Sequence, residues 1–264
     1  MNFAPVLPFG GLAGFALLTR TLDRQTALFN ASPALQRDTD YFQQRIGAVQ
    51  TAEDLVSDRR LLRVALGAFG LQEDIDSRAF VRAILEQGTE SEEALANRLS
   101  DDRYRRFTTA FGFADALGPR TTDPGFGARI VEQFRRREFE SAVGEQDGAL
   151  RLALNADREL ASLAGEAGSD NALWFRILGT PPLRRVFEGA LGLSPSFAQL
   201  DLDRQLGEIR SRAARQLGLD SPRDLVGGAL REALVRRFLL RDQVAAQGVL
   251  SSQSIALSLL QGGR

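Results

Sequence analysis

The side chains that most often carry out enzymatic chemistry are missing from this sequence. The chain has 264 residues with no His and no Cys, and all 33 of its basic residues are arginine. The usual general base, the thiolate nucleophile and lysine-based covalent chemistry are therefore excluded. Carboxylates, arginines, hydroxyls and two tyrosines remain. No motif places a carboxylate base beside a hydroxyl, so we expect a protein that is not an enzyme, with no catalytic residue.

Two acidic clusters could suggest a metal site, and two glycine pairs could suggest a phosphate loop. The clusters Gln72-Glu-Asp-Ile-Asp76 and Asp201-Leu-Asp203 lack the glycine and glutamate spacing of a calcium loop. Gly10-Gly11 and Gly227-Gly228 lack the spacing and the lysine of a nucleotide loop. A net charge of -1 argues against nucleic-acid binding. We therefore expect no metal, cofactor or nucleic acid.

The spacing of apolar residues predicts helices along nearly the whole chain. Apolar residues recur at helical spacing, strand-like alternation is almost absent, and β-branched residues are sparse. On one helix, Phe126, Ile130 and Phe134 recur every fourth residue, and Arg135-Arg-Arg137 is expected to be solvated surface. The sequence predicts an all-α fold of roughly ten helices, either a bundle or an irregular helical-repeat array, without a significant sheet.

Breaks in the helical pattern suggest four segments. The strongest interior break is residues 117–125, with two Pro and two Gly in a polar run. We expect a loosely ordered arm at residues 1–20, a helical subdomain at 21–118 and another at 119–243. An apolar helical tail is expected at 244–264, because one helix is expected to end near Asp242 and a separate helix to run from Gln243 to Leu260.

One short pattern occurs three times. It consists of Arg, four residues, Ala, Phe or Leu, Gly, and then Leu or Phe. The positions are Arg63, Ala68, Phe69, Gly70 and Leu71; Arg105, Ala110, Phe111, Gly112 and Phe113; and Arg185, Ala190, Leu191, Gly192 and Leu193.

The repeat reads as a helix stop rather than a catalytic motif. A glycine after an apolar helix end adopts the left-handed conformation cheaply, and the next apolar residue folds back onto the last turn. The small alanine permits close packing, and the arginine lies two turns back, exposed or paired with carboxylates. Both a true duplication and independent use of one capping motif are compatible with three short matches.

Two features could serve a protein partner. Trp174 is either a core anchor or a partner-binding residue. The tail has no charge from Gln243 to Gly263, and Leu250, Ile255 and Leu259 are candidate partner-binding residues because a low-charge helix should be buried. No apolar run reaches the ~20 residues that span a bilayer, and the N-terminus makes a poor signal peptide. We expect a cytoplasmic protein, or one exported without a cleaved signal; the oligomeric state is open.

A longer run carries a family resemblance. Tyr41-Phe42, followed by Thr51-Ala-Glu-Asp-Leu-Val-Ser-Asp-Arg-Arg-Leu-Leu-Arg-Val-Ala-Leu-Gly-Ala-Phe-Gly-Leu71, resembles an alphaproteobacterial family of unknown function. The resemblance continues from Leu95 through Phe113 and is weaker around Thr180 and Asp224. Members of that family are commonly encoded within flagellar gene clusters. The resemblance implies an association with the flagellum and brings no catalytic residue or cofactor.

These observations lead to three functional hypotheses. The first is a structural or assembly factor of the flagellum that acts through protein–protein contacts. The second is a cytosolic adaptor, chaperone or regulator of flagellar export or expression. The third is a helical module that binds a small molecule in a pocket between helices.

Overall fold

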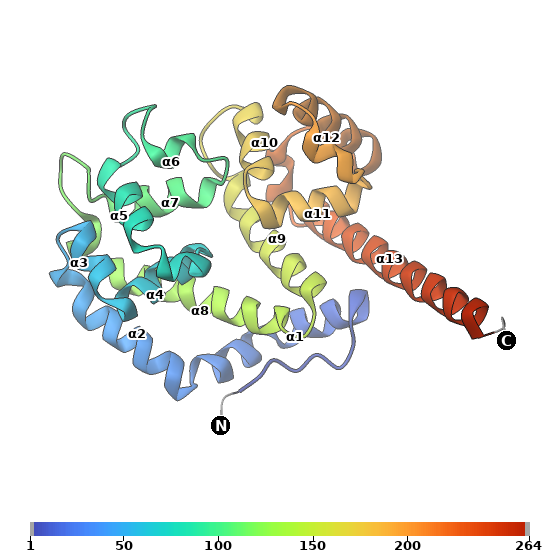
Figure 1. Cartoon of the computed structure of the whole chain (residues 1–264), viewed down its shortest axis with the longest axis horizontal. Coiled ribbons are helices and arrows are strands. Elements are labelled where there is room, and N and C mark those ends of the chain that lie inside the picture. The colour runs from blue at the N-terminus through green and yellow to red at the C-terminus, as the bar shows by residue number, and fades with distance from the viewer. Residues whose placement is uncertain (1–2, 262–264) are drawn as a thin grey trace. The chain divides into compact units, whose positions relative to one another are not determined.

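The computed structural model is all-helical, which confirms the predicted fold class. It describes the backbone of residues 3–261 and the side chains of residues 3–246. Within residues 3–261 there is no strand (Figure 1). The α-helices are α1 (Gly11–Asn30), α2 (Pro33–Arg45), α3 (Ala52–Ser57), α4 (Arg59–Phe69), α5 (Arg78–Gln87), α6 (Leu95–Arg98), α7 (Asp102–Phe111), α8 (Phe126–Gly144), α9 (Gly148–Ala164), α10 (Asp170–Leu178), α11 (Pro181–Leu191), α12 (Leu202–Leu217) and α13 (Ala229–Gln261). Short 3₁₀ turns are η1 (Ile46–Ala48), η2 (Gln72–Asp76), η3 (Arg120–Thr122), η4 (Pro195–Gln199) and η5 (Pro222–Val226).

The chain divides into two compact units. Unit 1 comprises residues 1–6 and 21–142, and unit 2 comprises residues 7–20 and 143–264. The predicted boundary at residues 117–125 is a real break between α7 and α8, but α8 still belongs largely to unit 1. The reason is packing, because Phe126, Ile130 and Phe134 are buried in the same hydrophobic cluster as Phe42. The pattern of apolar residues shows that α8 is amphipathic, but it does not show which core its apolar face enters.

Unit 1 is organised around α4. Leu62, Val64, Ala65 and Leu66 of this helix are all fully buried. A side chain can be buried on successive positions only when neighbours surround the helix, and α2, α3 and α7 all contact α4 (Figure 1). The core is rich in aromatic residues, and the rings of Phe107 and Phe111 lie 5.1 Å apart.

Unit 2 is built from α9, α11 and α13, which contact one another pairwise. Val186 and Phe187 of α11 and Leu234 and Leu239 of α13 are fully buried. α12 follows the sequence prediction closely. It begins after the N-cap Asp201 and ends at the left-handed Gly218.

The N-terminal segment is more ordered than the predicted loose arm. α1 begins at Gly11 and Leu18 is fully buried. Before the helix, the amide of Val6 donates a hydrogen bond of 2.7 Å to the side-chain oxygen of Gln25. Gln25 is itself buried, so it holds the backbone of the preceding segment in place.

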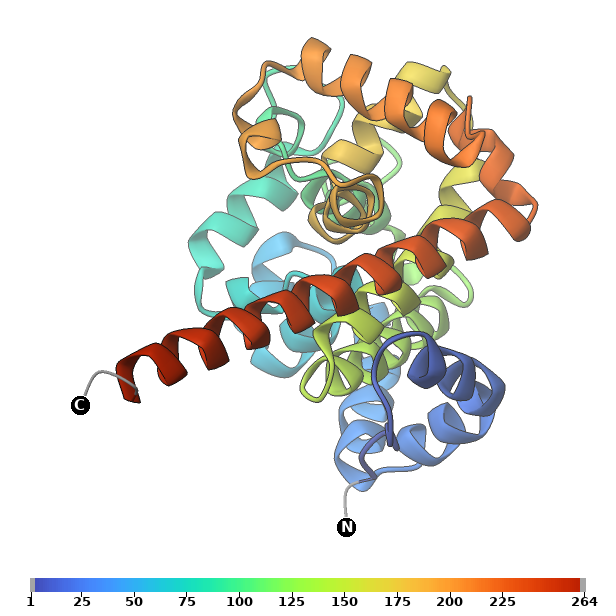
Figure 2. The same ribbon diagram turned by 90° about the vertical axis from the view of Figure 1, so that its right-hand side faces the viewer.

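The C-terminal segment is a single helix rather than the two that the sequence predicted. α13 runs without a break from Ala229 to Gln261 (Figure 2). Neither Gly nor Pro interrupts residues 229–247, and Gly248 lies within the helix. Among the described residues, no helix combines the length and the apolar character needed to cross a membrane.

Candidate interaction surfaces

The three glycines of the repeat all end helices. Gly70, Gly112 and Gly192 close α4, α7 and α11 with φ angles of 74°, 63° and 63°. After the first and third glycines, the chain folds back. The amide of Leu71 donates to the carbonyl of Leu66, and the amide of Leu193 donates to the carbonyl of Glu188, each at 2.9 Å. These are glycine-stopped helices that satisfy their terminal carbonyls.

The small and apolar residues of the repeat line the buried side of these helix ends. Ala68 and Ala190 are buried, whereas Ala110 is partly buried. Phe69, Phe111 and Leu191 are buried in their cores.

The arginines of the repeat have three different environments. Arg63 pairs with Asp38 of α2 at 2.6 Å and with Glu138 of α8 at 3.5 Å. Arg105 pairs with Asp102, three residues earlier on its own helix. Arg185 is exposed and has no ion-pair partner among residues 3–246. The arginine is therefore a surface residue whose partner depends on what lies beside the helix.

A second helix, α8, packs across the end of α4, where the first copy of the repeat lies. A Cβ atom added to Gly67 would lie 2.6 Å from the ring of Phe134 on α8, so the absence of a side chain at Gly67 lets the ring sit against the α4 backbone. One turn later on α8, Arg137 donates through Nε to the carbonyl of Ala68 at 2.8 Å. Arg103 of α7 donates to the carbonyl of Gly70. The end of α4 is thus closed by an aromatic ring and two guanidinium groups.

The third copy has the same arrangement in unit 2. A Cβ atom on Gly189 would lie 2.8 Å from the ring of Phe238 on α13. Arg237 donates through Nε to the carbonyl of Ala190 at 2.8 Å, and Arg212 of α12 donates to the carbonyl of Gly192 at 2.9 Å. One position differs, because Arg237 precedes its phenylalanine whereas Arg137 follows Phe134.

The second copy lacks this crossing helix. Its position equivalent to Gly67 and Gly189 is Thr109, which is exposed. The surroundings of Gly112 are the side chains of Asp115 and Arg120. The first and third copies therefore share a crossing helix as well as the helix stop, whereas the second copy shares only the helix stop.

The pattern of helix ends in the sequence does not reveal that the two crossing helices, α8 and α13, are similar. The signal lies in Ile130-Val-Glu-Gln-Phe-Arg-Arg-Arg137 and Leu234-Val-Arg-Arg-Phe-Leu-Leu-Arg241. In register, Arg137 corresponds to Arg241, and both side chains lie against the repeat glycine of their own unit. Of the three arginines expected on the surface, Arg135 bonds to Thr39 and Arg137 to Ala68, while Arg136 is exposed.

One of the two acidic clusters caps a helix, and the other accepts a hydrogen bond from a tyrosine. Asp201 caps α12 by accepting from the amide of Arg204 at 2.9 Å. Asp74 accepts from the hydroxyl of Tyr104 at 2.8 Å. Burial and this hydrogen bond raise the pKa of Tyr104 to about 12. Among the described residues, no group of His, Cys, Asp or Glu is arranged to hold a metal ion.

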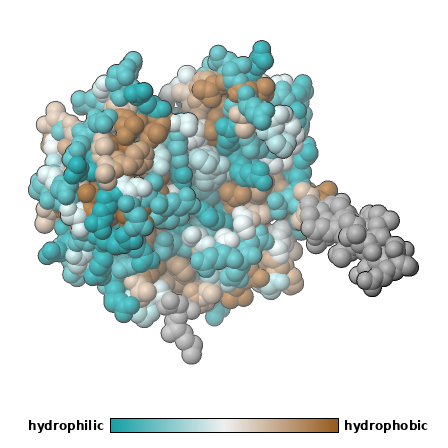
Figure 3. All heavy atoms as spheres, viewed as in Figure 1, coloured by the Kyte–Doolittle hydropathy of each residue, from teal (hydrophilic) through white to brown (hydrophobic). Residues whose placement is uncertain are grey.

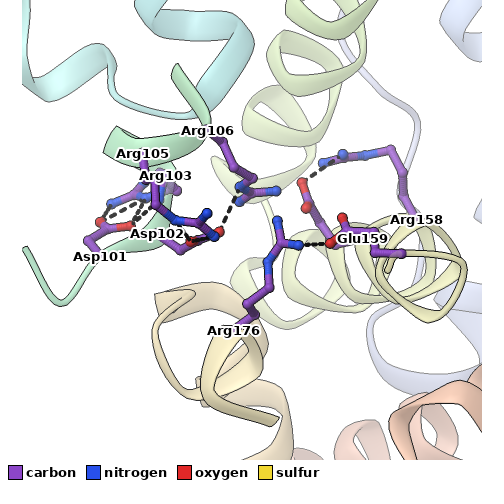
Figure 4. Close-up of polar contacts among 9 residues, drawn as sticks. Asp101, Asp102, Arg103, Arg105, Arg106, Arg158, Glu159 and Arg176 are labelled. Carbon is purple, nitrogen blue, oxygen red and sulfur yellow. Dashed lines mark hydrogen bonds and ion pairs between the residues drawn. The ribbon is translucent and has the colours of Figure 1, made fainter. Parts of the chain in front are cut away.

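Arginine–carboxylate pairs are dense around α7 and α9. Asp102 pairs with Arg105 at 2.7 Å and with Arg106 at 3.3 Å, and all three residues lie on α7 (Figure 4). On α9, Arg158 pairs with the buried Glu159 at 2.8 Å (Figure 4). Both carboxylates are therefore paired with arginine.

One open depression in unit 1 has a volume of about 610 Å³. Arg45, Ala48, Val49, Asp54, Ser57, Asp58, Arg59 and Leu61 line it. The two carboxylates already cap helices, because Asp54 accepts from the amide of Thr51 and Asp58 from the amide of Arg60, both at 2.9 Å. Both carboxylates of this depression therefore already accept hydrogen bonds from backbone amides.

Asp58 is the most strongly engaged residue of that depression. The hydroxyl of Tyr41 donates to its carboxylate at 2.6 Å. Burial alone would raise the pKa of Asp58, but the bonds from Tyr41 and from the amides of Leu61 and Arg60 outweigh it and lower the pKa. The same hydrogen bond to Asp58 raises the pKa of Tyr41.

Of the candidate partner-binding residues, Trp174 is placed in the core. Its side chain has no exposed surface, and its ring lies 5.8 Å from that of Phe187 in an edge-to-face contact. This corrects the partner-binding alternative, because a fully buried ring cannot contact another protein in this fold. The side chains of Leu250, Ile255 and Leu259 lie outside the described residues.

Along α13, buried residues give way to a run of exposed residues. Leu234, Val235, Phe238 and Leu239 are buried, but every residue from Arg241 to Ala246 is exposed. Leu240 and Val244 are 46% and 69% exposed, respectively. The helix therefore changes from a packed to an exposed element near residue 240.

Comparison with known proteins places this architecture in a family. A crystal structure of a structural-genomics target protein from Agrobacterium tumefaciens has a similar fold, with a TM-score of 0.70 and 24% sequence identity over 90% of this chain and 97% of that chain. The comparison with curated proteins gives no match. Residues 68–223, more than half of the chain, match the family described as "Protein of unknown function (DUF1217)". The chain therefore belongs to this family, DUF1217.

Proposed function

We propose that this chain is a non-enzymatic structural or assembly factor associated with the bacterial flagellum, and that it acts through protein–protein contacts. The observation that carries the contact hypothesis is α13. Its residues 241–246 are all exposed, the helix continues to Gln261, and no charge occurs from Gln243 to Gly263. Residues 243–246 are therefore both exposed and uncharged, and an exposed apolar side chain such as Val244 is stabilised by burial against a partner.

The flagellar association is supported by the resemblance of residues 41–71 to a family whose members are commonly encoded in flagellar gene clusters. The lack of His, Cys and Lys and the engagement of the carboxylates in caps and ion pairs agree with a role in contacts rather than catalysis. The small-molecule alternative gains no support from the open depression, whose carboxylates are already bonded to backbone amides.

The test is motility after deletion of the gene. We expect cells without this protein to lose swimming and to regain it when the full chain is restored. A version ending at residue 240, which lacks the exposed residues 241–246 and the chain that follows them, should fail to restore swimming while remaining folded. Normal swimming of the deletion strain would rule out a flagellar role.

Export distinguishes an assembly factor from a cytosolic adaptor. An exported component should appear in the culture supernatant and disappear from it when flagellar export is disabled. An adaptor or chaperone would remain in the cells in both strains.

A further inference from the structure

The last carbonyl groups of α11 are bonded by guanidinium groups from two other helices. Arg212 of α12 donates through Nη1 to the carbonyl oxygen of Gly192 at 2.9 Å. Arg237 of α13 donates through Nε to the carbonyl oxygen of Ala190 at 2.8 Å. The carbonyl end of a helix carries a partial negative charge, so both contacts are favourable. They hold two guanidinium groups in place at one helix end.

A third guanidinium group lies against the backbone of the same helix end. A Cβ atom added to Gly192 would overlap the guanidinium group of Arg241, which comes from α13. The missing side chain of Gly192 therefore leaves the space that this group occupies. Gly192 is thus in contact with Arg212 at its carbonyl oxygen and with Arg241 where a side chain would begin.

The arginines at this helix end outnumber the carboxylates that pair with them. Arg212 pairs with Glu208 at 2.6 Å, whereas Arg237 and Arg241 make no ion pair with the described residues of the chain. Asp242, the next residue along α13, makes no ion pair with that part of the chain either. The end of α11 contributes only about half a negative charge. The three arginines and their immediate partners therefore retain a positive charge of about one and a half.

The arginines at Gly192 differ from an ordinary arginine on the surface. Figure 3 shows hydrophilic residues over much of the visible surface, so an exposed charged side chain is by itself common. Arg212 and Arg241, in contrast, both contact one glycine, and like charges at short range repel each other. Within the described residues, Arg241 makes no hydrogen bond and Nη2 of Arg212 makes none. An oxyanion that bonds to both would offset the repulsion and would find its donors already in place.

The helix stops themselves indicate which oxyanion such an arginine takes. At the first stop, Arg103 donates to the carbonyl oxygen of Gly70, and its Nε and Nη2 donate to the carboxylate of Asp101 at 2.9 and 2.7 Å. At the third stop, Arg212 bonds the glycine carbonyl and pairs with Glu208. A carboxylate is therefore the group that pairs with the carbonyl-bound arginine at both stops, and the arginine on Gly192 has none.

We propose that Arg241, with Arg212 beside it at Gly192, binds a carboxylate side chain from an acidic segment of a protein partner. The inference names the chemistry of the partner and rests on the proposed function in taking a protein as the source of the carboxylate. Arg241 supplies a planar guanidinium group that can form two parallel hydrogen bonds to the carboxylate. Arg212 adds positive charge that favours further acidic residues of the same segment.

The experiment measures binding of a short fluorescein-labelled peptide of glutamate and glycine to the full chain by fluorescence anisotropy. We expect saturable binding to the wild type that weakens as NaCl is added, because salt screens exposed ion pairs. The same peptide with glutamine in place of glutamate should not bind. If the glutamate peptide shows no saturable binding, the proposal is overturned.

Two variants with the same change in net charge locate the site. Arg241→Gln should weaken binding of the glutamate peptide by about fivefold, the effect of losing one good exposed ion pair. Arg236→Gln is the matched control and should bind as the wild type does, because Arg236 is an exposed arginine of α13 that pairs only with Glu232, at 4.0 Å. Equal affinities of the two variants, weakened or not, would overturn the proposal.

A conservative variant tests the geometry of the pair. Arg241→Lys keeps the charge but loses the planar guanidinium group, so its affinity should lie between those of the wild type and Arg241→Gln. Circular dichroism and the fluorescence of Trp174 should show that all three variants are folded. An affinity of Arg241→Lys no better than that of Arg241→Gln would contradict the role of charge at this position.

Two further comparisons separate the sources of the anion and the two proposals. Displacement of the peptide by inorganic phosphate, where sodium acetate of the same ionic strength has no effect, would make a phosphate group the occupant and overturn the proposal. Weaker binding by Arg241→Gln alone, with normal swimming of a strain that lacks the gene, would leave this site standing and remove the flagellar role. Absence of peptide binding, with loss of swimming in that strain, would have the opposite meaning.

Discussion

The two units contain the same helix-crossing arrangement, built from nearly the same residue types. In each, a glycine-stopped helix is crossed by a helix whose phenylalanine lies on a glycine, and an arginine of the crossing helix bonds an alanine carbonyl at 2.8 Å. They differ in what covers the crossing helix. α8 contacts α1 through Phe139 and Phe29, whereas α13 contacts the start of α1 through Gln243 and Gly11 and leaves Leu240 and Val244 exposed. The shared contacts stabilise both helix crossings, and the units differ in which part of α1 the crossing helix contacts.

The two units also differ at the start of the glycine-stopped helix. The N-cap of α4 is Asp58, whose carboxylate accepts from two backbone amides. The N-cap of α11 is Thr180, whose side chain makes no cap hydrogen bond, and Pro181 and Pro182 follow. Proline has no N–H group, so fewer donors at this end need a cap. The start of α4 is thus stabilised by a carboxylate cap, whereas the start of α11 has fewer N–H groups that need a cap.

The chain supplies a separate spectroscopic signal for each unit. Trp174 is the only tryptophan and lies in unit 2, and the two tyrosines, Tyr41 and Tyr104, lie in unit 1. Tryptophan fluorescence therefore follows unit 2, and tyrosine absorbance follows unit 1. Each variant below should affect mainly the signal of its own unit.

The largest effects should come from the glycines beneath the crossing phenylalanines. Ala normally stabilises a helix over Gly by up to about 1 kcal/mol. In Gly67→Ala and Gly189→Ala, however, the added methyl would overlap the ring of Phe134 or Phe238. We expect each to lose about 2–3 kcal/mol in urea unfolding, by overpacking.

Gly207→Ala on α12 is the matched control, because no atom lies within 4 Å of its added Cβ. It should be neutral or slightly stabilising. If Gly67→Ala and Gly189→Ala both behave like Gly207→Ala, the rings are not close packed on these glycines; if only one of them does, the two units are not equivalent.

The next largest effects should come from the left-handed glycines. Gly70→Val and Gly192→Val force a β-branched residue into a positive φ angle, which costs about 1–2 kcal/mol. Each also brings Cβ against Arg137 or Arg241. Gly218→Val has the same backbone strain at φ 65° but open space around it. We expect all three variants to be destabilised in urea unfolding, and Gly218→Val the least. No change in Gly70→Val would contradict the helix-stop interpretation.

Removing the bonds to the alanine carbonyls should have a smaller effect. Arg137→Met and Arg237→Met keep most of the side-chain volume but leave the carbonyls of Ala68 and Ala190 without these donors. A loss of about 1 kcal/mol is expected for each in urea unfolding. Arg236→Met is the control, since Arg236 makes only an exposed ion pair with Glu232 at 4.0 Å. Equal stability of all three variants would mean that the arginines add nothing to the crossings.

The sequence predicts the local features of this fold well because they depend on neighbouring residues. Helix ends at Gly70, Gly192 and Gly218 follow from the conformational freedom of glycine and the apolar residue beside it. The caps at Thr51 and Asp201 follow from side chains that reach amides two or three residues away.

What the sequence did not reveal depends on partners far along the chain. Nothing local shows that Phe134 rests on Gly67, or that α8 joins the core of Phe42 rather than the unit that follows. The sequence leaves open whether Trp174 lies in the core or on the surface, because the ring that it contacts, Phe187, belongs to another helix, α11. Val244 lies in a tail that the sequence predicts to be buried, yet it is 69% exposed, and the adjacent Gln243 contacts Gly11 from the other end of the chain.

The smallest effect, and the one most specific to unit 1, is a pH dependence at Asp58. Hydrogen bonds from Tyr41 and two amides lower its pKa in the folded state. A lowered folded-state pKa contributes stability above the unfolded pKa of the carboxyl, and that stability is lost as the pH falls through the folded value. Asp58→Asn should therefore flatten the acid decline of the tyrosine-reported transition. The corresponding helix of unit 2 begins at Thr180, which has no carboxyl group. Thr180→Ala should leave the pH profile of the tryptophan-reported transition unchanged. An acid profile of the tyrosine signal that is the same for wild type and Asp58→Asn would show that this cap does not distinguish the two units.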